Sequence, residues 1–271
     1  GSVKTESTLP ITIDNVHVTG SVIIGTETAS TSVIVGGLVG RISSANNSPL
    51  VITNCISNFN ITATLGGLTN GTFELGFGGL IGKASGKPNA DITIKNSGAT
   101  GEIIASSQSN KQFCVGGLVA YCDTSDIILT IDNCYSKALI SAERSVFPSV
   151  SNTPMVAVGS FMGRFTGNAS SHINNCVALG GSLSMANSGT GTAGANRIVG
   201  VLTGSGTLSN NKANAAMTVN PEPTPDTFVE NGLGGANISL SETSSIISTL
   251  NTGAPNTWTW DSTHNVPILV K

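Results

Sequence analysis

Ile131-Asp132-Asn133-Cys134 is one copy of a short motif that recurs about every 40 residues along this 271-residue chain. In each copy an aliphatic residue stands two places before an asparagine, and in three copies a cysteine follows that asparagine. The copies are Ile13-Asp14-Asn15, Ile52-Thr53-Asn54-Cys55, Ile94-Lys95-Asn96, Ile131-Asp132-Asn133-Cys134, Ile173-Asn174-Asn175-Cys176 and, in degenerate form, Leu208-Ser209-Asn210. A pattern repeated at this interval predicts a repeat protein.

A second motif, Gly-x-Leu-x-Gly or a close variant, alternates with the first. Its copies are Gly36-Gly37-Leu38-Val39-Gly40, Gly78-Gly79-Leu80-Ile81-Gly82, Gly116-Gly117-Leu118-Val119-Ala120, Gly159-Ser160-Phe161-Met162-Gly163 and Gly200-Val201-Leu202-Thr203-Gly204. Successive copies start 42, 38, 43 and 41 residues apart, and the third and fourth depart from the glycine pattern at Ala120 and Ser160. Because the two motifs keep the same order throughout, each repeat is expected to be one structural unit of the same kind.

The alternation of inward and outward side chains changes phase at the asparagine. The residue two places before it is Ile or Leu, whereas after it the small and apolar residues stand one and three places on, as Cys134 and Ser136 do. This change of phase indicates a corner, which suits asparagine because its backbone tolerates left-handed angles and its amide can bond neighbouring copies. We predict a triangular coil with three short strands: one at Gly-x-Leu-x-Gly, one ending at the asparagine and one after it.

These features predict an all-β fold, a right-handed parallel β-helix of about five coils. Each strand can pair with its equivalent one repeat away, and the repeats lack the helical periodicity that crossover helices would need. The competing fold is a β-propeller, whose blades also span about 40 residues. Propeller blades, however, need four antiparallel strands with hairpin turns.

The two ends of the chain are expected to differ from the repeats. Residues 1–20 form a partial coil or N-terminal cap, residues 21–220 the repeats, and residues 221–271 a C-terminal cap. The run Asn220-Pro221-Glu222-Pro223-Thr224-Pro225 ends the last coil, because proline cannot donate a hydrogen bond to a sheet. Ser239-Leu240-Ser241-Glu242 has a capping-box pattern and predicts a short helix at about residues 240–250.

Two stretches carry a resemblance to a known family. Val35-Gly36-Gly37-Leu38-Val39-Gly40 and Ile131-Asp132-Asn133-Cys134-Tyr135-Ser136 resemble the repeat unit of GLUG-motif proteins, which occur in bacterial surface adhesins and in immunoglobulin A peptidases of Gram-positive bacteria. The resemblance covers about residues 33–219 and implies a surface-exposed stalk or adhesive region that is not itself catalytic. Thr257-Trp258-Thr259-Trp260-Asp261 is similar to the segment that ends such arrays in gut Bacteroidetes.

Composition narrows the functional classes. Only 10% of the residues are charged, the formal net charge is −3 and no Lys/Arg cluster occurs, so we expect no nucleic-acid partner. No run of about 18 apolar residues occurs, so no membrane span is expected. A surface rich in Ser, Thr and Asn favours an extracellular or cell-surface location, which includes anchoring to an outer membrane through a segment outside residues 1–271.

The five cysteines cannot form a complete set of disulfides, because their number is odd. Cys55, Cys134 and Cys176 share one inward column and are expected to form a buried ladder of small side chains. Cys114 and Cys122 flank the third Gly-Gly-Leu strand and are better candidates for a disulfide or for exposure. His and Cys pairs at metal-ligand spacing do not occur, so we expect neither a metal site nor a cofactor.

The histidines offer no recognisable catalytic constellation. His17, His172 and His264 lie far apart in the sequence, and none stands near a Ser or Cys nucleophile in an elbow motif. We expect isolated surface histidines and predict no catalytic residue.

Acidic residues give two further candidates. Asp123, Asp126 and Asp132 resemble part of a calcium loop, but the glycine and the terminal glutamate of such a loop are missing, which favours a solvated turn. Glycoside hydrolysis needs two carboxylates about 5–10 Å apart. The outward column just before the corner asparagine contains only Asp14 and Asp132, three coils apart.

The repeats differ most in the connections before each Gly-x-Leu motif, at about residues 64–76, 106–113, 143–157 and 186–197. These connections should emerge along one edge, which in solenoids is often the binding face. Their few apolar features are Phe73, Phe113, Phe147 and Pro148, which either pack within the loops or contact a ligand.

We therefore predict a non-enzymatic, adhesin-like module of the cell surface or the secreted space, whose loop-lined edge binds a host or matrix glycan or protein. It is expected to act as a monomer or as part of a longer surface chain. The alternative is a carbohydrate-active β-helix enzyme, either a polysaccharide lyase or a glycoside hydrolase, because β-helices often carry such sites on an exposed sheet face.

Overall fold

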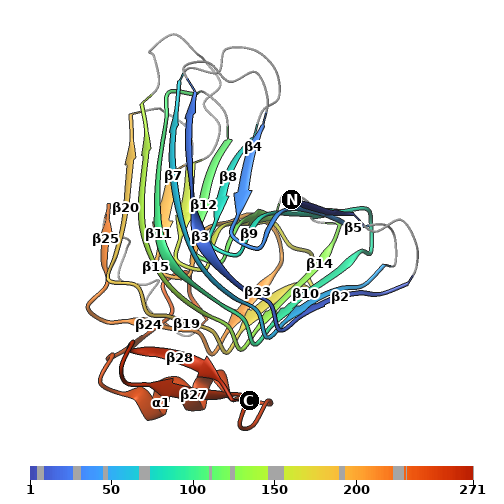
Figure 1. The fold of residues 1–271 in the computed structure, drawn as a ribbon, viewed down its shortest axis with the longest axis vertical. Coiled ribbons are helices and arrows are strands. Elements are labelled where there is room, and N and C mark those ends of the chain that lie inside the picture. The colour runs from blue at the N-terminus through green and yellow to red at the C-terminus, as the bar shows by residue number, and fades with distance from the viewer. Residues whose placement is uncertain are drawn as a thin grey trace.

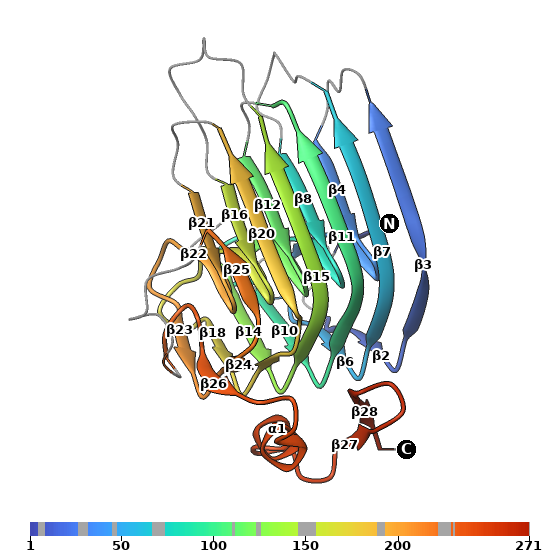
Figure 2. The same cartoon turned by 90° about the vertical axis from the view of Figure 1, so that its left-hand side faces the viewer.

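The protein is a stack of coils built almost entirely from strands (Figures 1 and 2). This computed structural model describes residues 1–4, 9–26, 32–44, 48–66, 74–109, 112–122, 126–145, 156–188, 193–221, 229 and 231–270. Four parallel sheets, A to D, run along the stack within these residues, and an antiparallel hairpin follows them. The prediction of an all-β parallel β-helix of about five coils is confirmed.

Sheets A and B form the lower arm of an L-shaped cross-section (Figure 1). In the described part of the chain, sheet A contains β1 (Ser2–Lys4), β5 (Val39–Ser44), β9 (Ile81–Gly86), β13 (Val119–Cys122), β17 (Met162–Phe165) and β22 (Val199–Leu202). Sheet B contains β2 (Ile11–Asp14), β6 (Leu50–Thr53), β10 (Asp91–Lys95), β14 (Ile128–Asp132), β18 (His172–Asn174) and β23 (Thr207–Ser209).

Sheets C and D form the upright arm. Sheet C contains β3 (His17–Thr26), β7 (Ile56–Leu65), β11 (Gly98–Ser107), β15 (Tyr135–Arg144), β19 (Val177–Ala178), β20 (Ser182–Asn187), β24 (Lys212–Asn214), β25 (Thr218–Asn220) and β26 (Ala236–Ile238). Sheet D contains β4 (Val33–Gly36), β8 (Glu74–Gly78), β12 (Gln112–Gly116), β16 (Val156–Gly159) and β21 (Ala193–Asn196). One coil therefore passes through sheets B, C, D and A in turn, as β6, β7, β8 and β9 do.

Each arm of the L encloses its own hydrophobic core. In the lower arm the isoleucines before the corner stack in register, with Ile52 against Ile94 and Ile94 against Ile131, all fully buried. In the upright arm Phe77 and Phe113 pack edge to face with ring centroids 6.0 Å apart. The repeated inward column thus supplies a continuous core, while the outward columns remain available on the surface.

The asparagine corner behaves as the sequence predicts. All six motif asparagines have positive φ, between 47° and 55°, in the left-handed region that asparagine tolerates better than most residues. Among the described motif asparagines, two amides donate to the neighbouring coil: Asn54 Nδ2 to Asp14 Oδ1 at 2.8 Å, and Asn210 Nδ2 to Asn175 Oδ1 at 2.7 Å. The amide of Asn133 points to a different partner, described below.

The predicted triangular coil with a strand at Gly-x-Leu-x-Gly is wrong. The Gly-Gly-Leu segment is a corner between two strands, so the first four coils have four strands each, and the fifth has five because its part of sheet C is divided into β19 and β20. In the second coil β8 ends at Gly78 and β9 begins at Ile81. The reason is close backbone approach, since a Cβ on Gly78 would lie 1.9 Å from the carbonyl oxygen of Ile81. Two consecutive glycines therefore permit a turn too tight for a side chain.

The fifth copy of the second motif also needs correction. Gly159 pairs with Asn196, and Met162 pairs with Val199, so the fifth corner is formed by residues 196–200. The copy predicted as Gly200-Val201-Leu202-Thr203-Gly204 is therefore shifted by four residues, because the equivalent of Gly159 is Asn196. Arg197 takes the place that the second glycine has in earlier coils and donates to the carbonyl oxygens of Gly234 and Gly235.

The cysteine ladder is confirmed. Cys55, Cys134 and Cys176 are fully buried, and each Sγ lies 3.6–3.7 Å from a carbonyl oxygen of the preceding coil. Cys114 and Cys122 are also fully buried thiols, so the expectation that one of them is exposed, or that they are bonded to each other, is wrong. Cys114 belongs to a small apolar cluster with Ala120, Tyr121 and Ala157.

Buried thiols predict alkaline destabilisation. Burial raises the pKa of Cys176 well above the ordinary value of 9.0, and burial raises the pKa of Tyr135 in the same direction. Above pH 9 the unfolded chain loses thiol protons that the folded chain retains, so the free energy of unfolding should fall, by on the order of 1–3 kcal/mol up to about pH 11. Urea unfolding across this range should show the fall, and Cys176→Ala should reduce it. A urea midpoint that does not change with pH would contradict the assignment.

The C-terminal lobe, residues 239–270, packs beside the stack under the corner where sheets B and C meet (Figures 1 and 2). It contains α1 (Thr243–Leu250), β27 (Trp258–Asp261) and β28 (Val266–Leu269). The predicted helix is present, but the predicted capping box is not formed, because Glu242 is itself the N-cap of α1 and makes no side-chain cap bond. The Glu242 carboxylate instead accepts from the N–H of Ser239, outside the helix, at 2.7 Å. β26, just before the lobe, pairs with β24 and extends the last coil. In the part of the chain that the structure describes, no helix is long and apolar enough to cross a membrane.

Candidate functional site

A groove of about 1580 Å³ lies between the outer face of sheet C and the C-terminal lobe. We call it the corner groove, because the corner asparagines of the first three coils line it. Its stack wall includes Asp14, Asn15, His17, Asn54, Ile56, Asn58, Asn60, Asn96, Thr100, Gly101, Glu102, Tyr135, Lys137, Leu139 and Gly181. Its lobe wall is formed by Asn256, Thr257, Asp261, His264 and residues 266–270. This volume exceeds that of an ordinary small-molecule pocket, about 300–1,000 Å³, and suits a longer ligand.

The stack wall is made of outward columns that repeat from coil to coil. Asn58 and Thr100 are opposite one another in paired strands β7 and β11, and Lys137 follows Thr100 in β15. Adjacent strands lie about 4.8 Å apart, so polar groups recur along the groove at that interval. The side chains of Asn15, Asn58 and Asn96 make no hydrogen bond to any described residue, which leaves their amides able to bind a ligand.

A local kink shapes the floor of the groove. Gly101 has φ +110°, and the pairing of β7 with β11 is interrupted there. Asn60 Oδ1 accepts from the Glu102 N–H at 2.8 Å and replaces the missing backbone bond. The kink holds the exposed Glu102 carboxylate on the outer face of the sheet, where it lines the groove.

The lobe is fixed to the fourth coil by Trp258. Its ring packs edge to face on Tyr135, with centroids 5.4 Å apart, and both side chains are about 2% exposed. Trp258 Nε1 donates to the Asn133 carbonyl oxygen at 3.0 Å. The Asn133 amide in turn donates to the carbonyl oxygens of Leu250 and Thr252, at 2.7 and 2.8 Å. A corner asparagine of the repeat thereby binds the backbone of the lobe.

Two further contacts set the position of the lobe wall. The Tyr135 ring lies over Gly98 of the third coil, where a Cβ would stand 2.2 Å from the ring, so only glycine fits there. Lys137 Nζ donates to the carbonyl oxygens of His264 and Asn265, both at 3.1 Å, and so ties the hairpin turn to sheet C. The groove therefore exists because coils three and four carry Gly98, Tyr135 and Lys137 at matching positions.

The corner groove is acidic. Three carboxylates, of Asp14, Glu102 and Asp261, face one ammonium, of Lys137, which gives a formal charge of −2 with the histidines neutral. His264 Nδ1 lies 2.6 Å from Asp261 Oδ2, and this hydrogen bond lowers the pKa of the Asp261 carboxyl. The groove is therefore expected to repel anionic ligands and attract cationic ones.

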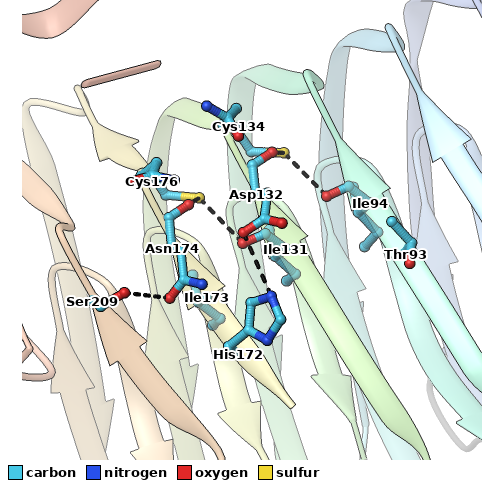
Figure 3. Close-up of polar contacts among 12 residues, drawn as sticks. Thr93, Ile94, Ile131, Asp132, Cys134, His172, Ile173, Asn174, Cys176 and Ser209 are labelled. Carbon is cyan, nitrogen blue, oxygen red and sulfur yellow. Dashed lines mark hydrogen bonds and ion pairs between the residues drawn. The ribbon is translucent and has the colours of Figure 1, made fainter. Parts of the chain in front are cut away.

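A second polar cluster lies on the outer face of sheet B (Figure 3). His172 Nε2 lies 3.7 Å from Asp132 Oδ1, and His172 Nδ1 lies 3.3 Å from the carbonyl oxygen of Ser170. Thr130 is opposite His172 in the paired strand, but no hydrogen bond joins them. Both nitrogens of the imidazole thus face other groups, and the cluster lacks the nucleophile–base contact that a triad needs.

The remaining sequence candidates are dispersed. Asp132 lies on sheet B, Asp126 lies in the turn before β14, and Asp123 lies outside the described residues. Among the described residues, no group of three His, Cys, Asp or Glu side chains is placed to hold a metal ion. Asp14 and Asp132 are three coils apart in register, as the sequence indicates.

The predicted loop edge lies only partly within the described residues. Phe113 is fully buried in the core of the upright arm, so it packs inside and does not contact a ligand. Phe73, Phe147 and Pro148 lie outside the described residues. A hollow of about 600 Å³ does lie at this end of sheet C, lined by residues that include Thr64, Ser106 and Glu143. It is smaller than the corner groove, and the sequence motifs do not predict that groove.

No family model matches the sequence, and the search of curated proteins found no match. Among solved structures, the chain is similar to one described as a putative immunoglobulin A1 protease from Bacteroides ovatus, with a TM-score of 0.48 and 16% sequence identity. The alignment covers 95% of this chain and 74% of that one.

Proposed function

We propose that this protein is a non-enzymatic binding module, adhesin-like and acting outside the cell or at its surface, which holds a host or matrix glycan or protein in the corner groove. One observation carries the proposal: a large groove is lined by repeated amide and charged side chains and bounded by a docked lobe. The GLUG-like motifs and the polar, weakly charged composition support this location and role.

The stack itself suits a binding role, because its rigid scaffold presents the ligand face at fixed spacing. The residues of the groove are outward on strands whose inward neighbours are fully buried, such as Ala99 beside Thr100 and Ala138 beside Lys137. A site on strands of a packed core is held in place without cost to the ligand on binding.

A blocking substitution should test the groove. Asn58→Trp places a large ring on the exposed floor, so binding to any ligand of the groove should fall at least about tenfold, whereas stability should change little because Asn58 is outward and exposed. Binding would be measured against arrays of matrix proteins and glycans. The matched control is Ser141→Trp, an exposed outward position of the same sheet that does not line the groove. Equal binding by both variants would rule out the groove as the site.

A carbohydrate-active enzyme is the second candidate, because carboxylates do share this groove. Asp14 lies before the corner and Glu102 lies two coils away, on the outer face of β11. Along β11, the backbone from Gly98, just after the corner, to Glu102 spans about 13 Å. This length exceeds the 5–10 Å that separates the two carboxylates of a glycosidase. A polysaccharide degradation screen distinguishes the two functions, since turnover of any polymer would overturn the binding-only proposal.

A further inference from the structure

We infer that the corner groove takes an extended polypeptide segment with basic and aliphatic side chains, in preference to a glycan. This inference rests on the proposed function and names the class of its ligand. Four features of the groove carry it: its contacts with backbone carbonyls, its aliphatic wall, its charge and its buried aromatic rings.

The stack wall already binds polypeptide backbone at one coil. Asn133 and Lys137 donate to four backbone carbonyl oxygens of the C-terminal lobe, at distances of 2.7–3.1 Å. Asn96, one coil away, occupies the same position as Asn133 and has the same left-handed backbone, but its amide has no described partner. The amides of Asn15, Asn58 and Asn96 can therefore donate to the carbonyls of a chain that continues along the groove.

The lobe wall offers aliphatic surface in a strand-like arrangement. Ile268 and Val270 are 41% and 51% exposed, two residues apart on and just after β28, and Leu139 is 43% exposed on the stack wall. An extended peptide presents alternate side chains to opposite sides. One set of aliphatic side chains can thus contact the lobe wall while the backbone faces the asparagines.

Charge selects among peptides. The groove has three carboxylates and one ammonium, and Glu102 and Asp14 are both exposed. Lys or Arg side chains of the ligand would reach these carboxylates, whereas an acidic peptide or an acidic polysaccharide would be repelled.

The aromatic rings argue against a glycan. Tyr135 and Trp258 line or border the groove but are each 2% exposed, because they pack on one another. Among the residues that line the groove, no exposed Phe, Tyr or Trp ring is present on which a sugar could stack; its exposed rings are the imidazoles of His17 and His264. Its exposed apolar groups are branched aliphatic chains, which suit peptide side chains better.

The test is selection from a random-peptide phage library on the immobilised chain, followed by titration of labelled peptides and of neutral oligosaccharides. Enriched peptides should contain Lys or Arg with Val, Ile or Leu. The double variant Asp14→Asn, Glu102→Gln should raise their dissociation constant about threefold to thirtyfold at low salt, and high salt should weaken binding to the natural chain similarly. The matched control is Glu143→Gln, an exposed carboxylate on the same sheet outside the groove.

The other outcomes are distinguishable. Enrichment of acidic peptides, or binding that the double variant leaves unchanged, would overturn the inference. Oligosaccharide binding that is lost in Asn58→Trp, with no peptide enriched, would overturn the peptide ligand and support the proposed function. Failure of peptides, matrix proteins and glycans to bind in a manner sensitive to Asn58→Trp would overturn both.

Discussion

Trp258→Ala should release the C-terminal lobe from the stack without unfolding the coils. The indole is buried against Tyr135 and donates to the Asn133 carbonyl oxygen, and removing a buried aromatic side chain of this size costs about 3–5 kcal/mol. The loss falls on docking of the lobe, because the strands of the stack pair with one another and not with the lobe. Hydrogen exchange in α1 should therefore accelerate at least about a hundredfold, while exchange in β10 and β14 should stay unchanged.

Two variants separate the contributions of Trp258. Trp258→Phe keeps a ring against Tyr135 but loses the Nε1–H donor, so it should cost only about 1 kcal/mol. Trp260→Ala, on the same strand but less buried, controls for loss of an indole in the hairpin. Unchanged protection of α1 in Trp258→Ala would show that the lobe is held by other contacts. Because the lobe forms one wall of the corner groove, Trp258→Ala should also abolish ligand binding.

The sequence predicts the parts of this structure that repeat. Register, inward columns, the asparagine corner and the cysteine ladder all follow from residues that recur at each coil, because every coil must stack on an almost identical neighbour. The four-strand coil was missed because Gly-x-Leu-x-Gly alternates like a strand; only the backbone contacts of Gly78 show that it turns. The register of the fifth corner was missed because Asn196 and Arg197 replace its glycines.

The corner groove could not be predicted for a different reason. It depends on contacts between residues 117 to 128 positions apart, such as Asn133 with Leu250 and Lys137 with Asn265, and these contacts occur once. A unique contact leaves no periodic signal. The sequence does hold one indication, since Tyr135 and Lys137 are large side chains at positions where the preceding coil has Gly98 and Thr100.

Gly79→Val should prevent the coils from stacking. Gly79 is the second glycine of the corner in coil two, and a Cβ there would lie 2.1 Å from the carbonyl oxygen of Gly117 in the next coil. Because this obstacle is backbone, a rotamer change cannot relieve it, and Leu80 and Ile81 both donate to Leu118 immediately beyond it. We expect a loss of more than about 3 kcal/mol, measured by urea unfolding, and poor soluble yield.

The matched control for Gly79→Val is Gly25→Val. Gly25 lies on edge strand β3, and a Cβ there meets no atom within 4 Å, so the same substitution should change stability by no more than about 0.5 kcal/mol. In coil four the corresponding residue is Ser160, which is an exception to the glycine rule. Its hydroxyl lies 3.5 Å from Ser136 Oγ, and the equivalent residue in the next coil is Arg197 and not glycine. Gly79 instead faces Gly117 in the next coil, so the arrangement that accommodates Ser160 is not present there. A Gly79→Val protein with the same urea midpoint as the natural chain would mean that the corner can widen, and the close approach of glycines would then not be what sets the four-strand coil.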